Sequence, residues 1–138
     1  MSAIAATALA WLAALGRREA PRLLSLSDPG IVIFGPRGAT KGYAALGMWF
    51  GETRVALTPR DVLQCGDRIL IRHQTDWLDR EGRRTHTAAN ASVIAIKDGK
   101  VECRYGTKVE SVVLDADPDS GAPAKFNAKG PAGGEVIP

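Results

Sequence analysis

The sequence predicts an α+β domain in which a strongly curved antiparallel sheet wraps around helices near the N-terminus. Three tight-turn dipeptides indicate the sheet: Gly66-Asp67, Glu81-Gly82 and Asp98-Gly99. Each is flanked by residues that alternate between apolar and polar, the local signature of a β-hairpin. Apolar residues at helical spacing precede these turns, and helices followed by a meander of strands are typical of the α+β class.

The first fifty residues are expected to form helices around one short strand. Apolar residues recur at helical spacing near the N-terminus, which predicts an amphipathic helix packed on the sheet. The expected elements are helices at Ala3–Leu15, Glu19–Leu26 and Tyr43–Phe50, a strand at Ile31–Phe34 and a glycine-rich loop at Gly35–Gly42.

Four long strands are expected to follow and to complete the domain. The turns place them at Arg54–Cys65, Arg68–Asp79, Arg83–Lys97 and Lys100–Leu114. From Asp115 onward Pro and Gly pairs crowd the chain and no periodic apolar pattern remains. We therefore expect one domain over residues 1–114 and a Pro/Gly-rich C-terminal tail over 115–138.

Composition argues against several classes of function. The net charge is only +3 over 138 residues and the basic residues are scattered, so no nucleic-acid surface is predicted. The apolar stretch Ser2–Leu15 is too short to span a membrane. Cys65 and Cys103 lack the spacing of a zinc site, so we expect no metal, no cofactor and a cytoplasmic protein with reduced thiols.

One face of the predicted sheet carries a row of polar side chains among apolar ones. Two-residue turns set the register of each hairpin, and register decides which side chains share a face. The resulting polar row comprises Arg60, His73, Asn90 and Thr107, with Ile71, Ser92 and Tyr105 before it and Trp77 and His86 beyond it. Convergent polar groups on an apolar face indicate a small-molecule pocket.

The polar row supplies candidates for catalysis and binding. His73 is the candidate acid/base, since histidine titrates near neutral pH, and its alternative is a core histidine bonded to a neighbouring amide. Asn90 and Tyr105 are expected to orient or polarise a ligand oxygen, and Arg60 to hold an anionic group. The remaining candidates for ligand contact or cavity wall are Phe34, Trp49, Phe50, Trp77, Ser92 and Thr107.

The other face of the sheet is expected to form a homodimer contact. Small residues there, Ala89 and Ala91, are ringed by polar ones, and Asp61 falls opposite Arg72 as a cross-strand ion pair. The residues predicted for this face are Leu57, Asp61, Leu63, Leu70, Arg72, Gln74, Asp76, Ala89, Ala91, Val93 and Arg104.

The chain resembles the nuclear transport factor 2-like superfamily over about residues 4–112. That cone-shaped fold is shared by ketosteroid isomerase, scytalone dehydratase, limonene epoxide hydrolase and the SnoaL-like polyketide cyclases. The segments that carry the resemblance are Asp28–Ile33, Gly42–Leu46, Cys65–Ile69 and Ile96–Val101. The resemblance implies the α+β cone fold, a pocket inside the cone and homodimers formed through the sheet.

The chain departs from the enzymes of that superfamily at the catalytic positions. Gly35 stands where the isomerase pattern has its Asp base, and Asn90 or Ser92 falls near the position of its oxyanion acid. The epoxide-hydrolase pattern needs two Asp and an Arg, and the predicted pocket face offers only Arg60.

These departures leave two hypotheses for function. The first is a SnoaL-like enzyme, a cyclase, isomerase or dehydratase, that uses acid/base chemistry without a cofactor on a hydrophobic carbonyl compound. The second is a non-catalytic module of the same fold that binds a small ligand or forms dimers.

Overall fold

The computed structural model describes residues 2–35, 38–108, 112–115 and 125–128. Three helices lie before or between the first strands of the chain. They are α1 (Ala3–Gly16), α2 (Ala20–Ser25) and α3 (Tyr43–Glu52), close to the ranges expected from the sequence. Ser2 caps α1, because its hydroxyl oxygen accepts the backbone N–H of Ala5 at 3.1 Å. None of these helices is long and apolar enough to cross a bilayer.

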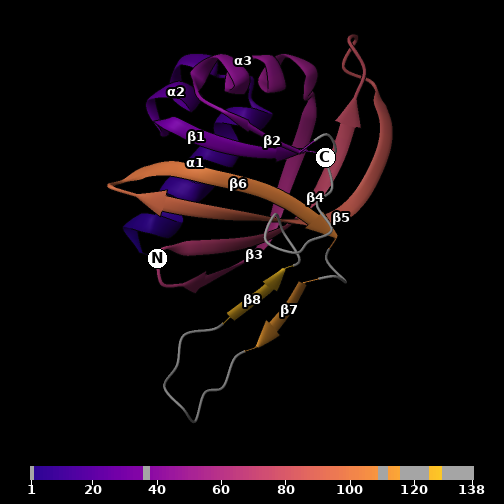
Figure 1. Cartoon of the computed structure of the whole chain (residues 1–138). Helices are drawn as coiled ribbons and strands as arrows, with labels where there is room; N and C mark the ends of the chain where they lie inside the picture. Colours follow the sequence, from indigo (N-terminus) through magenta and orange to yellow (C-terminus); the bar gives the residue numbers. More distant parts are fainter. Residues whose placement is uncertain (1, 36–37, 109–111, 116–124, 129–138) are drawn as a thin grey trace.

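A six-stranded sheet curves around these helices (Figure 1). Its strands lie in the order β2-β1-β6-β5-β4-β3. All neighbours pair antiparallel except β1 and β6, which are parallel. The strand bounds are β1 Ser27–Gly35, β2 Gly38–Lys41, β3 Val55–Cys65, β4 Arg68–Leu78, β5 Arg84–Lys97 and β6 Lys100–Lys108. The α+β class is confirmed, whereas the loop expected over Gly35–Gly42 contains strand β2.

The main hydrophobic core lies between α1 and the concave face of the sheet. Trp11, Leu12 and Leu15 of α1 are almost fully buried against inward-facing strand residues such as Ile69 and Ile94. A smaller cluster lies on the opposite face of the sheet, where Leu70, Ala91 and Val93 are buried and Phe34, Leu63 and Cys103 pack against them. The sheet is therefore apolar on both faces over its central strands.

The three predicted turns all form hairpins. Asp98 and Gly99 both have positive φ, 52° and 76°, as a two-residue turn of this kind requires. The loop at Glu81-Gly82 is longer than predicted, since β4 ends at Leu78 and β5 begins at Arg84. Thr85 is then an extra residue between two paired positions, which restores the predicted register, so that His73 lies opposite Asn90.

Two further β-bulges change which side chains face the helices. In β3, Pro59 pairs with His73 and Asp61 pairs with Arg72, which leaves Arg60 as the extra residue. In β6, Val101 pairs with Ile96 and Cys103 with Ala95, which leaves Glu102 as the extra residue. Beyond each bulge the alternation of inward-facing and outward-facing side chains is shifted by one residue, so each side chain lies on the opposite face from the one predicted.

Because of the bulges, Arg104, Tyr105, Thr107 and Leu57 have other cross-strand partners than the sequence pattern predicts. Beyond Glu102 it is Arg104 that pairs with Ile94, while Tyr105 pairs with Val93 and Thr107 with Ala91. The predicted neighbours Ser92–Tyr105 and Asn90–Thr107 are therefore wrong by one residue. On the N-terminal side of Arg60, Leu57 pairs with Thr75 and faces the core, although the sequence pattern assigned it to the opposite face.

The sequence predicts one strand over Lys100–Leu114 followed by a tail, and the structure differs from this. Strand β6 ends at Lys108, and β7 (Val112–Asp115) pairs instead with β8 (Lys125–Ala128) in a separate two-stranded sheet. Figure 1 shows this pair in yellow and orange, below the main sheet. The expected boundary after Leu114 falls within β7.

Candidate functional site

A small cavity lies inside the cone, between the helices and the concave face of β3, β4, β5 and β6. Its volume is about 30 Å³, close to the share of one water molecule in the liquid. Its inner end is buried and its outer end is formed by half-exposed residues. It is lined by Leu15, Trp49, Thr53, Val55, Leu57, His73, Thr75, Trp77, Asn90, Ala91 and Arg104.

His73 lies in the buried end of this cavity, with 2% of its surface exposed. Its Nε2 is 2.8 Å from Ser92 Oγ, and its Nδ1 is 3.0 Å from Thr75 Oγ1. Burial, together with the smaller effect of the nearby charge of Arg104, lowers the pKa of His73 from 6.5 to about 4. His73 is consequently an uncharged imidazole at neutral pH, held at both ring nitrogens by hydroxyl groups.

Arg104 enters the same space from β6, although the sequence pattern assigned it to the opposite face. Its Nη2 donates to Ser92 Oγ at 3.2 Å, and its Nε and Nη1 are buried without a hydrogen-bond partner in the part of the chain that the structure describes. Its Cζ lies 5.3 Å from the centroid of the Trp49 ring, within cation–π range. Burial lowers the pKa of Arg104 to about 10, which still leaves the guanidinium charged at pH 7.

Asn90 adds a second incompletely bonded polar group. It lies directly opposite His73, as predicted, and only 7% of its surface is exposed. Its Oδ1 is buried and has no hydrogen-bond partner among the described residues. The cavity thus holds donors on Arg104 and an acceptor on Asn90 that remain available to a ligand.

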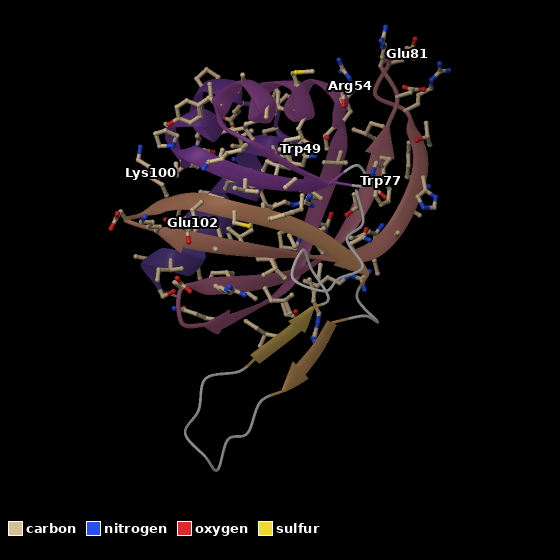
Figure 2. All side chains as sticks on the ribbon, in the orientation of Figure 1. Trp49, Arg54, Trp77, Glu81, Lys100 and Glu102 are labelled. Carbon is tan, nitrogen blue, oxygen red and sulfur yellow. The ribbon has the colours of Figure 1, made fainter. Side chains whose placement is uncertain are left out.

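Aromatic rings form the outer part of the cavity wall. Trp49 from α3 and Trp77 from β4 both line it, and Figure 2 shows them on the side of the molecule where α3 and the β4–β5 hairpin lie. Trp49 stacks on Trp11 with ring centroids 5.9 Å apart, and Trp77 packs on His86 at 5.1 Å. Each indole therefore packs against a second ring.

A larger hollow lies beside the cavity, between α1 and β3. Its volume is about 440 Å³, and it is lined by Leu9, Leu12, Ala13, Gly16, Arg17, Ala56, Leu57 and Pro59. Leu57 lines both spaces. Only Arg17 carries a charge in this lining, so the hollow is an apolar groove of the size that small ligands occupy.

The structure brings together about half of the side chains predicted for the site. His73, Asn90, Trp49 and Trp77 line the cavity, and Ser92 is bonded to His73 and Arg104.

Other predicted site residues lie elsewhere. Arg60 is exposed and donates to Gln74 Oε1 at 3.1 Å, because it sits in the β3 bulge. Phe34 packs in the cluster on the opposite face, since Ile33 is the neighbour that points inward. Phe50 packs on the main core with Arg18 3.9 Å above its ring. For Tyr105 and Thr107 the backbone register alone is described, and it pairs them with Val93 and Ala91.

Sequence reasoning missed Thr75 and Arg104. Thr75 could have been found, because it lies two residues from both His73 and Trp77 and alternation places all three on one face. Arg104 carried no such signal, since only the bulge at Glu102 turns it inward. On the opposite face the predicted ion pair between Asp61 and Arg72 is confirmed at 3.4 Å.

No group of three or more His, Cys, Asp or Glu that could hold a metal ion occurs in the described part of the chain. The polar chemistry of the cavity is therefore that of an imidazole, hydroxyls, an amide and a guanidinium.

Solved structures share the fold of this chain. TerC, co-crystallised with polyporic acid, matches with a TM-score of 0.68 at 19% identity, over 79% of this chain and 93% of TerC. A protein of unknown function with a cystatin-like fold from Xanthomonas campestris matches with a TM-score of 0.67 at 20% identity, over 79% of this chain and 92% of that one. A putative polyketide cyclase from Sinorhizobium meliloti matches with a TM-score of 0.64 at 15% identity, over 73% and 93%.

At these identities the matches establish the fold alone. No curated protein matches the chain. The model of the SnoaL-like domain matches residues 8–103, which include most of α1, every residue that lines the cavity except Arg104, and most of the main sheet. The chain therefore belongs to the SnoaL-like family of the nuclear transport factor 2-like superfamily.

Proposed function

We propose that the protein is a cofactor-independent enzyme of the cyclase, isomerase or dehydratase kind that acts on a hydrophobic carbonyl compound. The observation that carries this proposal is the uncharged His73, held at the buried end of a cavity with aromatic walls. A neutral imidazole can take up a proton through the hydroxyl bonded to it: the hydroxyl oxygen accepts the proton of the carbon next to a carbonyl while its own proton passes to the ring nitrogen, and the reverse step returns it.

The neighbours of His73 suit this role. Ser92 and Thr75 contact one ring nitrogen each, so they fix the orientation of the imidazole. Arg104 donates to Ser92 Oγ, which leaves the Ser92 proton free to bond Nε2 of His73. The amide of Asn90 lies on the neighbouring strand opposite His73 and would orient the substrate oxygen.

The names of two structures with this fold support the same ligand class. TerC was co-crystallised with polyporic acid, and the Sinorhizobium meliloti protein is described as a putative polyketide cyclase. The apolar groove beside Leu57, about 440 Å³, would take the hydrophobic body of such a ligand.

Proton exchange tests the proposal without knowledge of the full reaction. A panel of aromatic and cyclic ketones is incubated with the protein in D₂O, and loss of the α-proton signals is followed by NMR. We expect exchange to be accelerated by the wild type and reduced at least tenfold in His73→Gln. The matched control is His86→Gln, the other histidine of the chain, which is exposed. Equal exchange in the wild type and His73→Gln would refute a proton-transfer role for His73.

A non-catalytic binding protein is the second candidate, and a specific observation favours it. The residues that line the cavity include no carboxylate, and the lowered pKa of His73 makes it a weak base. Ligand binding that is retained when no member of the panel exchanges its protons would favour this candidate over the enzyme.

A further inference from the structure

Arg104 is a buried cation without a counter-charge in the part of the chain that the structure describes. Only 7% of its surface is exposed, and its single hydrogen bond goes to the neutral hydroxyl of Ser92. None of the ion pairs among the described residues includes it, and no Asp or Glu lines the cavity.

A guanidinium in this position is costly to the free protein. Removing a charge from water is unfavourable unless a partner and a full set of hydrogen bonds replace the solvent. Here Nε and Nη1 are both buried with no acceptor among the described residues, and the Trp49 ring offers only a weak cation–π contact at 5.3 Å. An anion bound in the cavity would supply both the missing charge and the missing acceptors.

We propose that Arg104 binds a carboxylate group of the substrate, so that the substrate of the proposed enzyme is a hydrophobic carboxylic acid. A carboxylate is planar and accepts several N–H bonds, which matches the guanidinium better than any other common anionic group of its size. This inference rests on the proposed function for the identity of the site, and it adds the chemical class of the molecule that occupies it.

The dimensions of the cavity favour a small anionic head group. A volume of about 30 Å³ holds one such group and not a whole hydrophobic ligand. The aromatic rings of Trp49 and Trp77 line the same space, so an apolar body attached to the carboxylate would meet indole surface. An aromatic carboxylate therefore fits the lining in both its charged and its apolar part.

Binding of benzoate, compared with its neutral isostere benzamide, tests the inference directly. Affinity is measured by calorimetry and by the fluorescence of the tryptophans, on the wild type and on Arg104→Met, Arg104→Lys and Arg60→Met. Arg60→Met is the matched control, because Arg60 is an exposed arginine in the β3 bulge and does not line the cavity.

We expect the wild type to bind benzoate at least tenfold more tightly than benzamide. Arg104→Met should lose this preference, Arg104→Lys should keep part of it, and Arg60→Met should be unchanged. Equal binding of the two probes by the wild type, or unchanged benzoate binding by Arg104→Met, would overturn the inference. Loss of ketone exchange in Arg104→Met without any benzoate binding by the wild type would also overturn it, since Arg104 would then serve only an enolate formed during the reaction.

A second readout covers the case in which Arg104→Met does not fold. Arg104 lowers the pKa of His73, so a carboxylate bound between them should raise the pKa of His73 in the wild type. The ring signals of His73, titrated by NMR with benzoate and with benzamide, should shift only with benzoate. An unchanged titration contradicts the inference.

The outcome is independent of catalysis, because no turnover is needed for either readout. If benzoate binding requires Arg104 while His73→Gln leaves proton exchange unchanged, the enzyme proposal fails and the carboxylate site stands.

Discussion

His73 and Arg104 meet at one oxygen atom, the hydroxyl of Ser92. Nε2 of His73 lies 2.8 Å from Ser92 Oγ, and Nη2 of Arg104 lies 3.2 Å from the same atom. This shared contact joins β4, β5 and β6 inside the cone and keeps a fixed positive charge beside an uncharged imidazole.

Stability should depend on pH through His73. A pKa lowered from 6.5 to about 4 means that the unfolded chain binds more protons than the folded one between these two values. The free energy of unfolding should therefore rise by about 3 kcal/mol from pH 4 to pH 6.5 and stay flat above that. Urea unfolding across this range measures it, and the difference from His73→Gln isolates the contribution of His73. Parallel pH profiles for the two proteins would contradict the prediction.

Ser92→Ala should destabilise the fold and weaken anion binding together. The substitution removes the one side-chain hydrogen bond that Arg104 makes to a described residue and one partner of His73, and buried groups left unsatisfied cost about 1–3 kcal/mol each. Thr75→Val, which removes the other partner of His73 and leaves Arg104 untouched, is the comparison. We expect benzoate affinity to fall in Ser92→Ala and to persist in Thr75→Val, and the reverse order would show that Ser92 does not position Arg104.

Leu57→Ala should widen the passage between the small cavity and the apolar groove. Leu57 lines both, and its truncation should cost about 2 kcal/mol, the lower end of the range for Leu→Ala, because the side chain is only half buried. We expect binding of 4-phenylbutyrate to strengthen relative to benzoate, measured by calorimetry. Leu9→Ala, which enlarges the groove alone, should leave that ratio unchanged. Equal ratios in all three proteins would show that the two spaces are not joined through Leu57.

The proposed homodimer is best tested at Ala89. Ala91, the other small residue of that face, is fully buried within a single chain, so Ala91→Arg should unfold the protein and reports nothing about assembly. Ala89 is exposed, and Ala89→Arg should convert a dimer to a monomer by light scattering with little change in melting temperature. A wild type that is monomeric at micromolar concentration refutes the dimer.

Local patterns were sufficient to predict most of the fold. The helical spacing of the first apolar residues predicts α1, and the three turn dipeptides predict the hairpins of β3 to β6. The pairing of His73 with Asn90 was also predicted correctly, but the two-residue turn on which the prediction rested is only part of the explanation. The β4–β5 loop is longer than a two-residue turn, and the bulge at Thr85 cancels the difference.

The site was predictable only where no bulge intervened. On β4 and β5 the alternation runs unbroken from Ile69 to Trp77, and His73, Asn90, Ser92 and Trp77 all lie where it places them. Beyond the bulges the same alternation failed. It assigned Arg60 to the cavity and Arg104 to the opposite face, and the structure reverses both.

The sequence by itself therefore determined the α+β class, the hairpin turns and one half of the cavity wall, because each follows from contacts between residues close in the chain. Only the tertiary structure decided which arginine enters the cone. The alternation of apolar and polar residues does not reveal an extra residue in a strand, because a bulge is defined by the pairing with the partner strand. The bulge at Glu102 lies in β6, which pairs with β5 on one side and β1 on the other, and it turns Arg104 inward.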